Sequence, residues 1–185
     1  MALLHYPVLN KQGEVIASSV TNLDLHDIAR AARTFGVHRF FVVTPLADQQ
    51  ELVREITGHW ETGSGARYNP DRRSALRTIR LADTLEDVAA AIREPEAQSP
   101  EPMIIATTAS MEACCRDRVM TVRRCRELLD DGRRILLCFG TAWGLAPEFM
   151  DGADAILSPI QGPGAYNHLS VRSAAAILLD RLLAG

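Results

Sequence analysis

Ser158–Leu183, SPIQGPGAYNHLSVRSAAAILLDRLL, begins as a turn and continues as a helix. Its first seven residues contain two prolines and two glycines, a density that is typical of turns. Beyond them, apolar side chains recur at the spacing of one helical face. They are Val171, Ala174, Ala175, Leu178, Leu179 and Leu182. The stretch therefore predicts a core helix that starts from a specially shaped loop.

The end of this loop carries four polar side chains, Tyr166, Asn167, His168 and Ser170. Helix N-termini leave backbone N–H groups without intrahelical partners, and polar ligands are often bound there. Two interpretations stay open. The loop is either a ligand-binding segment or a Pro/Gly connection in which an Asn or Ser side chain caps the helix.

Length and composition indicate a single domain spanning residues 1–185. A chain of 185 residues with 47% hydrophobic residues can fill one core but is too short for two ordinary domains. No window reaches the ~20 apolar residues of a membrane span. The opening residues, MALLHYPVLNKQ, are too short and too polar for a signal peptide. We therefore expect a soluble, cytoplasmic protein.

The four cysteines predict neither a metal site nor a disulfide framework. Cys114, Cys115, Cys125 and Cys138 show no CxxC spacing and have no histidines nearby in the sequence. Buried or idle thiols in a reducing compartment are the better interpretation, and no metal is expected.

The basic residues are almost all arginines. The net charge of −3 argues against a protein that coats nucleic acid non-specifically, but 19 of the 20 basic residues are arginine and many cluster at 67–80 and 116–134. Arginine binds phosphate bidentately, so contact with RNA is chemically natural. The alternative is a GC-rich coding sequence that replaces lysine by arginine throughout.

The first half alternates extended and helical segments. Leu3–Leu9, Val15–Val20 and Arg39–Thr44 are expected to be extended, and Leu46–Gly58 to be helical. Leu25–Phe35 predicts a helix with an apolar face and Gly36 as its stop. Its polar face carries His26, Asp27, Arg30 and Arg33. A solvated helix with an Asp27–Arg30 pair is the structural explanation of that face.

Trp60–Asp71, WETGSGARYNPD, has no periodicity and predicts a long loop. Tyr68 lies among Arg67, Arg72 and Arg73, an arrangement that suits a stacked base and its phosphates. In the alternative interpretation, the Tyr68 side chain only holds the loop against the protein.

Further along, Arg72–Leu81 and Thr84–Arg93 are expected to be helical, and 94–102 to be an exposed linker within the domain. The second half then repeats one unit three times. Met103–Thr107, Ile135–Phe139 and Ala155–Leu157 are short apolar runs, each followed by a small-residue loop and a helical pattern. Such βα units predict a mostly parallel sheet with helices on both faces.

Ligands bind at the carboxyl ends of the strands in such sheets, where three loops rich in Gly, Ser and Thr follow the three strands. These loops are Thr107–Ser110, Gly140–Leu145 and Pro159–Ser170. Neither GxGxxG nor GxxxxGK[ST] occurs, and HExxH, GxSxG and the kinase motifs are absent as well. The motifs of common nucleotide, hydrolase and metal sites therefore do not identify the ligand.

FGTAWGLAPE and LSPIQGPGAYNHLSVRSAAAI resemble the second and third motifs of SPOUT-class RNA methyltransferases. Arg30, six residues before Gly36, resembles the arginine of the first motif in the SpoU-like branch. The match is closest to a small bacterial family of S-adenosylmethionine (SAM)-dependent RNA methyltransferases that is sometimes fused to a tRNA guanine methyltransferase. The resemblance covers nearly the whole chain and implies a SPOUT fold with a C-terminal trefoil knot.

The chain departs from this pattern in all three motifs. Thr141-Ala142-Trp143 stands where the second motif usually has a glutamate, and Ser170 and Arg172 stand where the third has Asn-x-Ser. Asp24-Leu25-His26 replaces the Asn-x-Gly of the first motif. Methyl transfer as a class is compatible with these changes, whereas the choice between a ribose 2′-hydroxyl and a base as acceptor stays open.

The resemblance also implies roles for particular residues. The implied SAM-binding residues are Thr107, Thr108, Gly140, Thr141, Gly144, Leu145, Ile160, Gly162, Asn167, Leu169 and Ser170. Arg30 would bind a phosphate or stabilise an oxyanion, because an arginine scarcely deprotonates, and would reach the site of a partner in a homodimer. Asp24, Asp27 and His168 are the candidate bases. Arg33, Arg67, Tyr68, Arg72 and Arg73 are the candidate RNA contacts.

Trp143 faces the sulfonium in one interpretation and packs against the protein in the other. Two further functions stay open beside a SAM-dependent methyltransferase acting on RNA, in particular tRNA. One is a knotted SAM- or RNA-binding module without turnover. The other is an unrelated α/β enzyme that binds a nucleotide.

Overall fold

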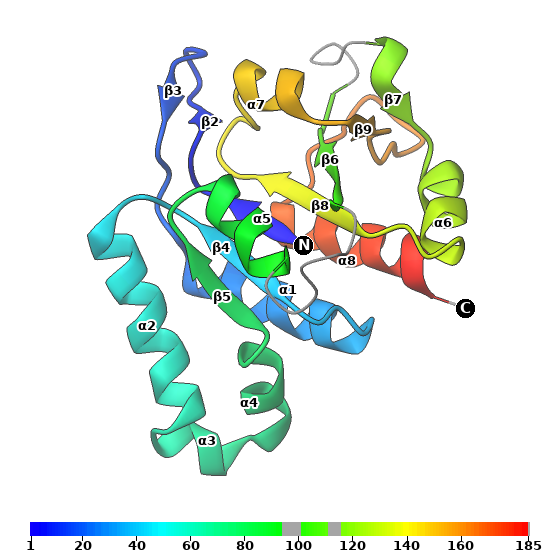
Figure 1. Ribbon diagram of the computed structural model, residues 1–185. Coiled ribbons are helices and arrows are strands. Elements are labelled where there is room, and N and C mark those ends of the chain that lie inside the picture. Colours follow the sequence, from blue (N-terminus) through cyan, green and yellow to red (C-terminus); the bar gives the residue numbers. More distant parts are fainter. Residues whose placement is uncertain (94–100, 111–115, 185) are drawn as a thin grey trace.

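The computed structural model describes residues 1–93, 101–110 and 116–184 (Figure 1). The strands are β1 (Ala2–Leu4), β2 (Val8–Leu9), β3 (Val15–Ile16), β4 (Phe40–Val43), β5 (Ile79–Ala82), β6 (Met103–Thr107), β7 (Val119–Met120), β8 (Ile135–Gly140) and β9 (Ala155–Leu157). The helices are α1 (Asn22–Thr34), α2 (Ala47–Glu61), α3 (Ser64–Tyr68), α4 (Pro70–Leu76), α5 (Leu85–Arg93), α6 (Val122–Asp130), α7 (Pro147–Gly152) and α8 (Val171–Leu183), with a 3₁₀ turn at Arg116–Arg118.

The centre of the molecule is a parallel sheet of seven strands in the order β5-β4-β1-β8-β6-β9-β7. The three strands predicted in the second half are β6, β8 and β9, and they lie next to one another with β6 in the middle. The predicted α/β class and the parallel sheet are therefore confirmed. The short strand β7, which the sequence analysis did not predict, extends the sheet beyond β9.

Helices cover both faces of this sheet. Successive strand residues point to opposite faces, so each strand contributes side chains to the core on either side. In β4, Phe40 and Val42 pack into the core that also contains α1 and α8, while Phe41 and Val43 pack into the core beneath α5 and α7. Figure 1 shows α1 and α8 side by side along the first face. The buried face of α8 consists of Ala175, Leu178, Leu179 and Leu182, and the other two residues of the predicted face, Val171 and Ala174, are half-buried.

The segment expected to be one strand at Leu3–Leu9 is divided in two. A cis peptide bond joins Tyr6 to Pro7 between β1 and β2. β2 lies outside the main sheet and forms an antiparallel hairpin with β3. The hairpin lies against the segment after β8, since the backbone N–H of Leu9 donates to the Gly144 carbonyl at 2.9 Å.

The predictions for 60–81 were wrong in three places. α2 continues to Glu61, and α3 lies in the middle of the expected long loop. α4 begins at Pro70, where the Asn69 side chain accepts a hydrogen bond from the backbone N–H of Arg72, and ends at Leu76. The rest of the expected helix is β5, which pairs with β4. Arginines in that stretch obscured a strand that is buried only at its two ends.

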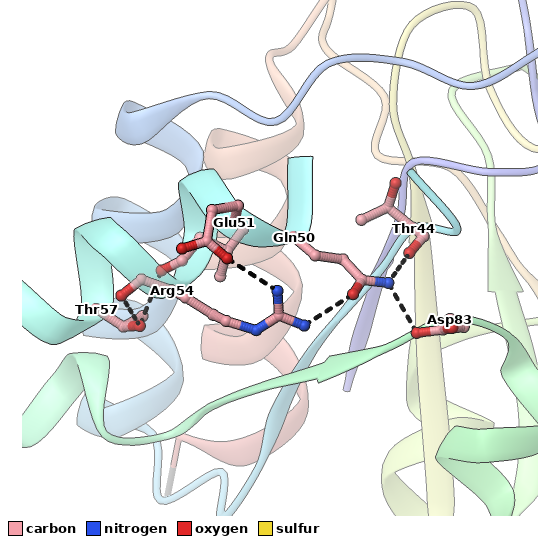
Figure 2. Close-up of polar contacts among 7 residues, drawn as sticks. Thr44, Gln50, Glu51, Arg54, Thr57 and Asp83 are labelled. Carbon is pink, nitrogen blue, oxygen red and sulfur yellow. Dashed lines mark hydrogen bonds and ion pairs between the residues drawn. The ribbon is translucent and has the colours of Figure 1, made fainter. Parts of the chain in front are cut away.

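Gln50 fixes the start of α2 to the carboxyl ends of β4 and β5 (Figure 2). Its amide nitrogen donates to the Thr44 carbonyl at 2.9 Å and to the Asp83 carboxylate at 2.7 Å. Its amide oxygen accepts from Arg54 at 2.9 Å. A buried amide with these partners satisfied holds the helix in one position against the sheet.

None of the helices in the described part of the chain is long and apolar enough to cross a membrane. Cys125 and Cys138 are buried free thiols, and burial raises the pKa of Cys125 to about 11 and that of Cys138 to about 12. Cys114, Cys115 and most of the expected linker lie outside the described residues.

Candidate functional site

A pocket of about 880 Å³ lies at the carboxyl ends of β6, β8 and β9. All three predicted loops contribute to its wall, together with the segment between β3 and α1 and the first turns of α8. Phe139, Ile156, Leu157 and Leu178 supply an apolar lining. The topology of a parallel sheet, in which the βα loops share one edge, explains why segments so far apart in sequence meet here.

The loop after β8 has a backbone that few sequences can adopt. A Cβ atom on Gly140 would lie 2.8 Å from the backbone nitrogen of Leu145, so only glycine fits. Ala142 has φ 51° and Gly144 has φ 108°, both in the left-handed region. Hydrogen bonds to β2 hold this shape, since the backbone N–H of Trp143 donates to the Leu9 carbonyl at 3.0 Å. The Trp143 side chain is 64% exposed, so it does not pack as one interpretation expected.

A chain of three side chains runs from this loop into the core. The Thr141 hydroxyl lies 2.5 Å from the Ser18 hydroxyl and donates to the Leu4 carbonyl at 3.1 Å. The Ser18 hydroxyl is in turn 3.0 Å from Nδ1 of His5, which is fully buried. Burial lowers the pKa of His5 to about 4, so its imidazole is neutral at pH 7. Ser18 and Thr141 line the pocket, and His5 supports them from behind.

The loop before α8 caps the helix and also lines the pocket. The Ser170 hydroxyl caps α8 by accepting a hydrogen bond from the backbone N–H of Ser173 at 3.3 Å. The Asn167 amide donates to the carbonyls of Ile160 at 2.9 Å and Ala109 at 3.4 Å, which ties this loop to the one after β6. Both residues also line the pocket. The Ser170 side chain therefore takes part in both capping and pocket formation.

An ion-pair cluster joins α1 to the start of α8 beside the pocket. Arg172 contacts Asp24 (Nη1 to Oδ1, 3.2 Å) and Asp27 (Nε to Oδ2, 3.5 Å). The second oxygen of Asp24 accepts a hydrogen bond from the Thr21 hydroxyl at 2.7 Å. Asp27 therefore pairs with a residue 145 positions away rather than with Arg30, as the helix spacing had suggested.

The structure brings most of the predicted cofactor residues together. Thr107, Thr108, Gly140, Thr141, Gly144, Leu145, Ile160, Asn167, Leu169 and Ser170 all line the pocket. Gly162 does not. Among the candidate catalytic residues, Asp24 and His168 line the pocket, whereas Asp27 and the exposed Arg30 do not.

Several pocket residues had no role predicted from the sequence, among them Ser18, Arg118 and Arg172. Ser18 and Arg118 carried no motif, and Arg118 donates to the carbonyls of Asp151 and Ala153 beside the pocket. Arg172 was visible only as a departure from the third motif.

The candidate RNA contacts gather around α1, α3 and α4, which pack together. The Arg72 guanidinium lies 4.7 Å from the centre of the Trp60 ring, whose edge meets His26. Arg33 donates to Ser74 at 3.0 Å, and Arg67 is exposed. Tyr68 is 86% exposed, so it does not pin the segment.

Within the described ranges, the ion pairs between side chains do not involve Arg33, Arg67, Arg72 or Arg73. Over the same ranges, no three His, Cys, Asp or Glu side chains gather closely enough to hold a metal ion.

Residues 1–184 match the model of a family described as SAM-dependent RNA methyltransferase. The chain belongs to this family. It is 45% identical over 98% of its length to a tRNA (guanine-N(1)-)-methyltransferase of Nitratidesulfovibrio vulgaris and 44% identical over 98% to the enzyme of that name from Oleidesulfovibrio alaskensis. The chain spans 41% of the length of each of these relatives.

Among solved structures, the SpoU methyltransferase AviRb from Streptomyces viridochromogenes, in complex with the cofactor AdoMet, has the same fold. The TM-score is 0.59 at 15% identity, and the alignment covers 99% of this chain and 56% of AviRb. At this identity the likeness concerns the fold alone. The resemblance to SpoU-like SPOUT proteins seen in the motifs is thus matched by the arrangement of the strands and helices.

The pocket of this family member fits SAM. Its volume of about 880 Å³ lies within the range of small-molecule sites. The lining combines buried apolar side chains, which suit an adenine ring, with the hydroxyls of Thr107 and Thr108 and the amide of Asn167. The tight approach at Gly140 leaves backbone groups of the loop, rather than long side chains, at the pocket wall.

Proposed function

We propose that this chain transfers the methyl group of SAM to RNA, and specifically to a tRNA. The observation that carries the proposal is the family match over residues 1–184, combined with a pocket built from the loops that hold the family motifs. The two curated relatives named as tRNA methyltransferases support tRNA as the substrate class. A protein acting on tRNA would work in the cytoplasm.

SAM supplies a methyl group that its sulfonium already activates. The protein therefore has to hold donor and acceptor in line and to take one proton from the acceptor. The backbone of Gly140–Leu145 and the side chains of Thr107, Thr108, Asn167 and Ser170 would hold the cofactor. Gly162 would shape the loop from outside the pocket.

His168 is the better candidate for the proton acceptor. Both carboxylate oxygens of Asp24 already have partners, Arg172 and Thr21, and Asp27 is paired with Arg172 outside the pocket. His168 lines the pocket, and its ring, which has Tyr166 at its edge, makes no hydrogen bond within the described residues. We therefore assign Asp24 to positioning, with Arg172 as its counter-ion.

Arg30 would act in the site of a second subunit. It is exposed on α1 and does not line the pocket of its own chain. A homodimer formed through the α1 and α8 layer would bring Arg30 of one protomer to the pocket of the other. The arginines at 33, 67, 72 and 73 would then bind RNA phosphates, with Arg72 oriented by Trp60.

A trefoil knot in the C-terminal segment is part of the same proposal. It is supported by the strand order, in which β8 lies between β1 and β6, and by the likeness to SpoU folds. Knotting would pass the segment after β9 through the loops that form the pocket.

Isothermal titration with SAM tests the first step, with ATP and NAD as control ligands. Saturable SAM binding near one site per chain, followed by transfer of a radioactive methyl group to unmodified tRNA transcripts, is the expected result. SAM binding without transfer to any transcript would favour a binding module instead. Binding of ATP or NAD in preference to SAM would contradict the proposal.

Within this assay, His168→Ala should lower the transfer rate while the Kd for SAM stays unchanged. Arg30→Ala should do the same, and mixing it with a His168→Ala protomer should restore activity at one of the two sites if the sites are shared. Absence of restoration in the mixed dimer would contradict the assignment of Arg30 to the partner's site.

A further inference from the structure

The chain has two tryptophans, and their environments differ sharply. Trp60 packs against the core, with Arg72 over its ring and His26 and His59 in T-shaped contact with it. Trp143 lines the pocket and yet keeps 64% of its surface exposed. A large aromatic side chain exposed on a pocket wall is the kind of group that a bound ligand covers.

The loop presents Trp143 in a defined position. The residues on either side have left-handed backbone conformations, and the Trp143 N–H is bound to β2. With 64% of its surface exposed, Trp143 is not folded inward against the apolar lining. Leu169, on the loop before α8, is a second exposed apolar side chain of the same pocket, at 44%. The pocket wall thus has exposed apolar groups on two different loops.

We infer that Trp143 stacks on a nucleobase of the RNA that accepts the methyl group. The inference rests on the proposed function. The buried part of the pocket, lined by Phe139, Ile156 and Leu157, can enclose the cofactor, whereas Trp143 offers its ring to the solvent side, from which a macromolecule approaches. Every nucleobase has a flat π face, so a tryptophan can hold the acceptor without reading its sequence.

Fluorescence gives a direct test, because Trp60→Phe leaves Trp143 as the only tryptophan while keeping an aromatic ring for Arg72. Addition of unmodified tRNA transcripts to this variant, saturated with SAM, should quench its emission strongly. Inorganic polyphosphate, which has phosphates but no bases, should not. The matched control is Trp143→Phe, in which Trp60 remains as reporter; because Trp60 packs against the core with Arg72 over its ring, RNA should quench it less than it quenches Trp143. Equal quenching in both variants would overturn the inference.

Affinity provides a second readout. Stacking on an aromatic side chain is worth about 1–3 kcal/mol per base, so Trp143→Ala should weaken tRNA binding by roughly 5- to 150-fold. Trp143→Phe should retain most of the affinity, and the Kd for SAM should stay within about twofold in both variants. Because the side chain is largely exposed, we expect both proteins to fold, and their circular dichroism checks this.

The outcomes separate this inference from the proposed function. Wild-type protein that binds SAM and tRNA, with Trp143→Ala binding tRNA equally well, overturns the stacking role alone. Weakened SAM binding with unchanged tRNA binding assigns Trp143 to the cofactor and also overturns it. Wild-type protein that binds neither SAM nor tRNA overturns both.

Discussion

The buried histidine behind the pocket should make the stability of the fold sensitive to mild acid. His5 has no exposed surface, and burial lowers its pKa from 6.5 to about 4. In the unfolded chain the imidazole titrates near its ordinary value. Between these two values the unfolded state binds more protons than the folded state, so the free energy of unfolding decreases as the pH falls through 6.5 toward 4.

The two pKa values give the size of the effect. Integration between pH 7 and pH 5 yields a loss of about 2 kcal/mol from His5 alone. Urea denaturation at the two pH values measures it. His5→Asn, which keeps a polar group near the position of Nδ1 for Ser18 but does not titrate, should lose about 2 kcal/mol less than the wild type over this interval.

His38 is the matched control because it is exposed. His38→Gln should show the pH dependence of the wild type. The comparison of wild type with His5→Asn isolates His5 from other groups, including His26, whose pKa is also lowered, first of all by burial. Identical pH dependence in the wild type and His5→Asn would refute the reasoning.

Three further outcomes follow from the geometry of the site. Gly140→Ala, whose Cβ would lie 2.8 Å from a backbone nitrogen five residues on, should lower stability by about 1–3 kcal/mol and weaken SAM binding, as urea denaturation and titration calorimetry would show. Arg172→Ala leaves the largely buried Asp24 without its counter-ion and should cost about 1–3 kcal/mol, whereas Arg123→Ala, on an exposed pair, should cost at most about 1 kcal/mol. Cys138, buried with a pKa of about 12, should resist alkylation in the folded protein at pH 8 and react after denaturation, as mass spectrometry of its peptide would show.

The elements that could be predicted from the sequence are those with a strong periodic signal. β6, β8 and β9 are apolar runs with turn residues after them, and α8 has an uninterrupted apolar face. β7 has two residues and no pattern of its own, so it could not be recognised. It is a strand because it pairs with β9, a neighbour that the local sequence does not reveal.

Within the site, too, some features could be predicted from the sequence and others could not. The loops could be placed at one edge of the sheet from the order of the elements, because parallel strands share their carboxyl ends. The local backbone conformation around a single side chain could not be predicted in this way. The backbone at Trp143 is held by a hydrogen bond to β2 between two left-handed residues, and the hairpin that supplies this bond exists only in the folded chain.

Two departures from the SpoU-like pattern acquire one physical explanation in the structure. Asp24 stands where the first motif has asparagine, and Arg172 stands where the third has serine; each change alone would place a charge beside the pocket. The two side chains, 148 residues apart in sequence, lie 3.2 Å from each other. A carboxylate that is largely buried requires a partner, and the arginine provides it. Because each charge compensates the other, the two departures are best understood as one change, in which an ion pair replaces two neutral side chains. It joins α1, which carries Arg30, to the helix that starts at the pocket.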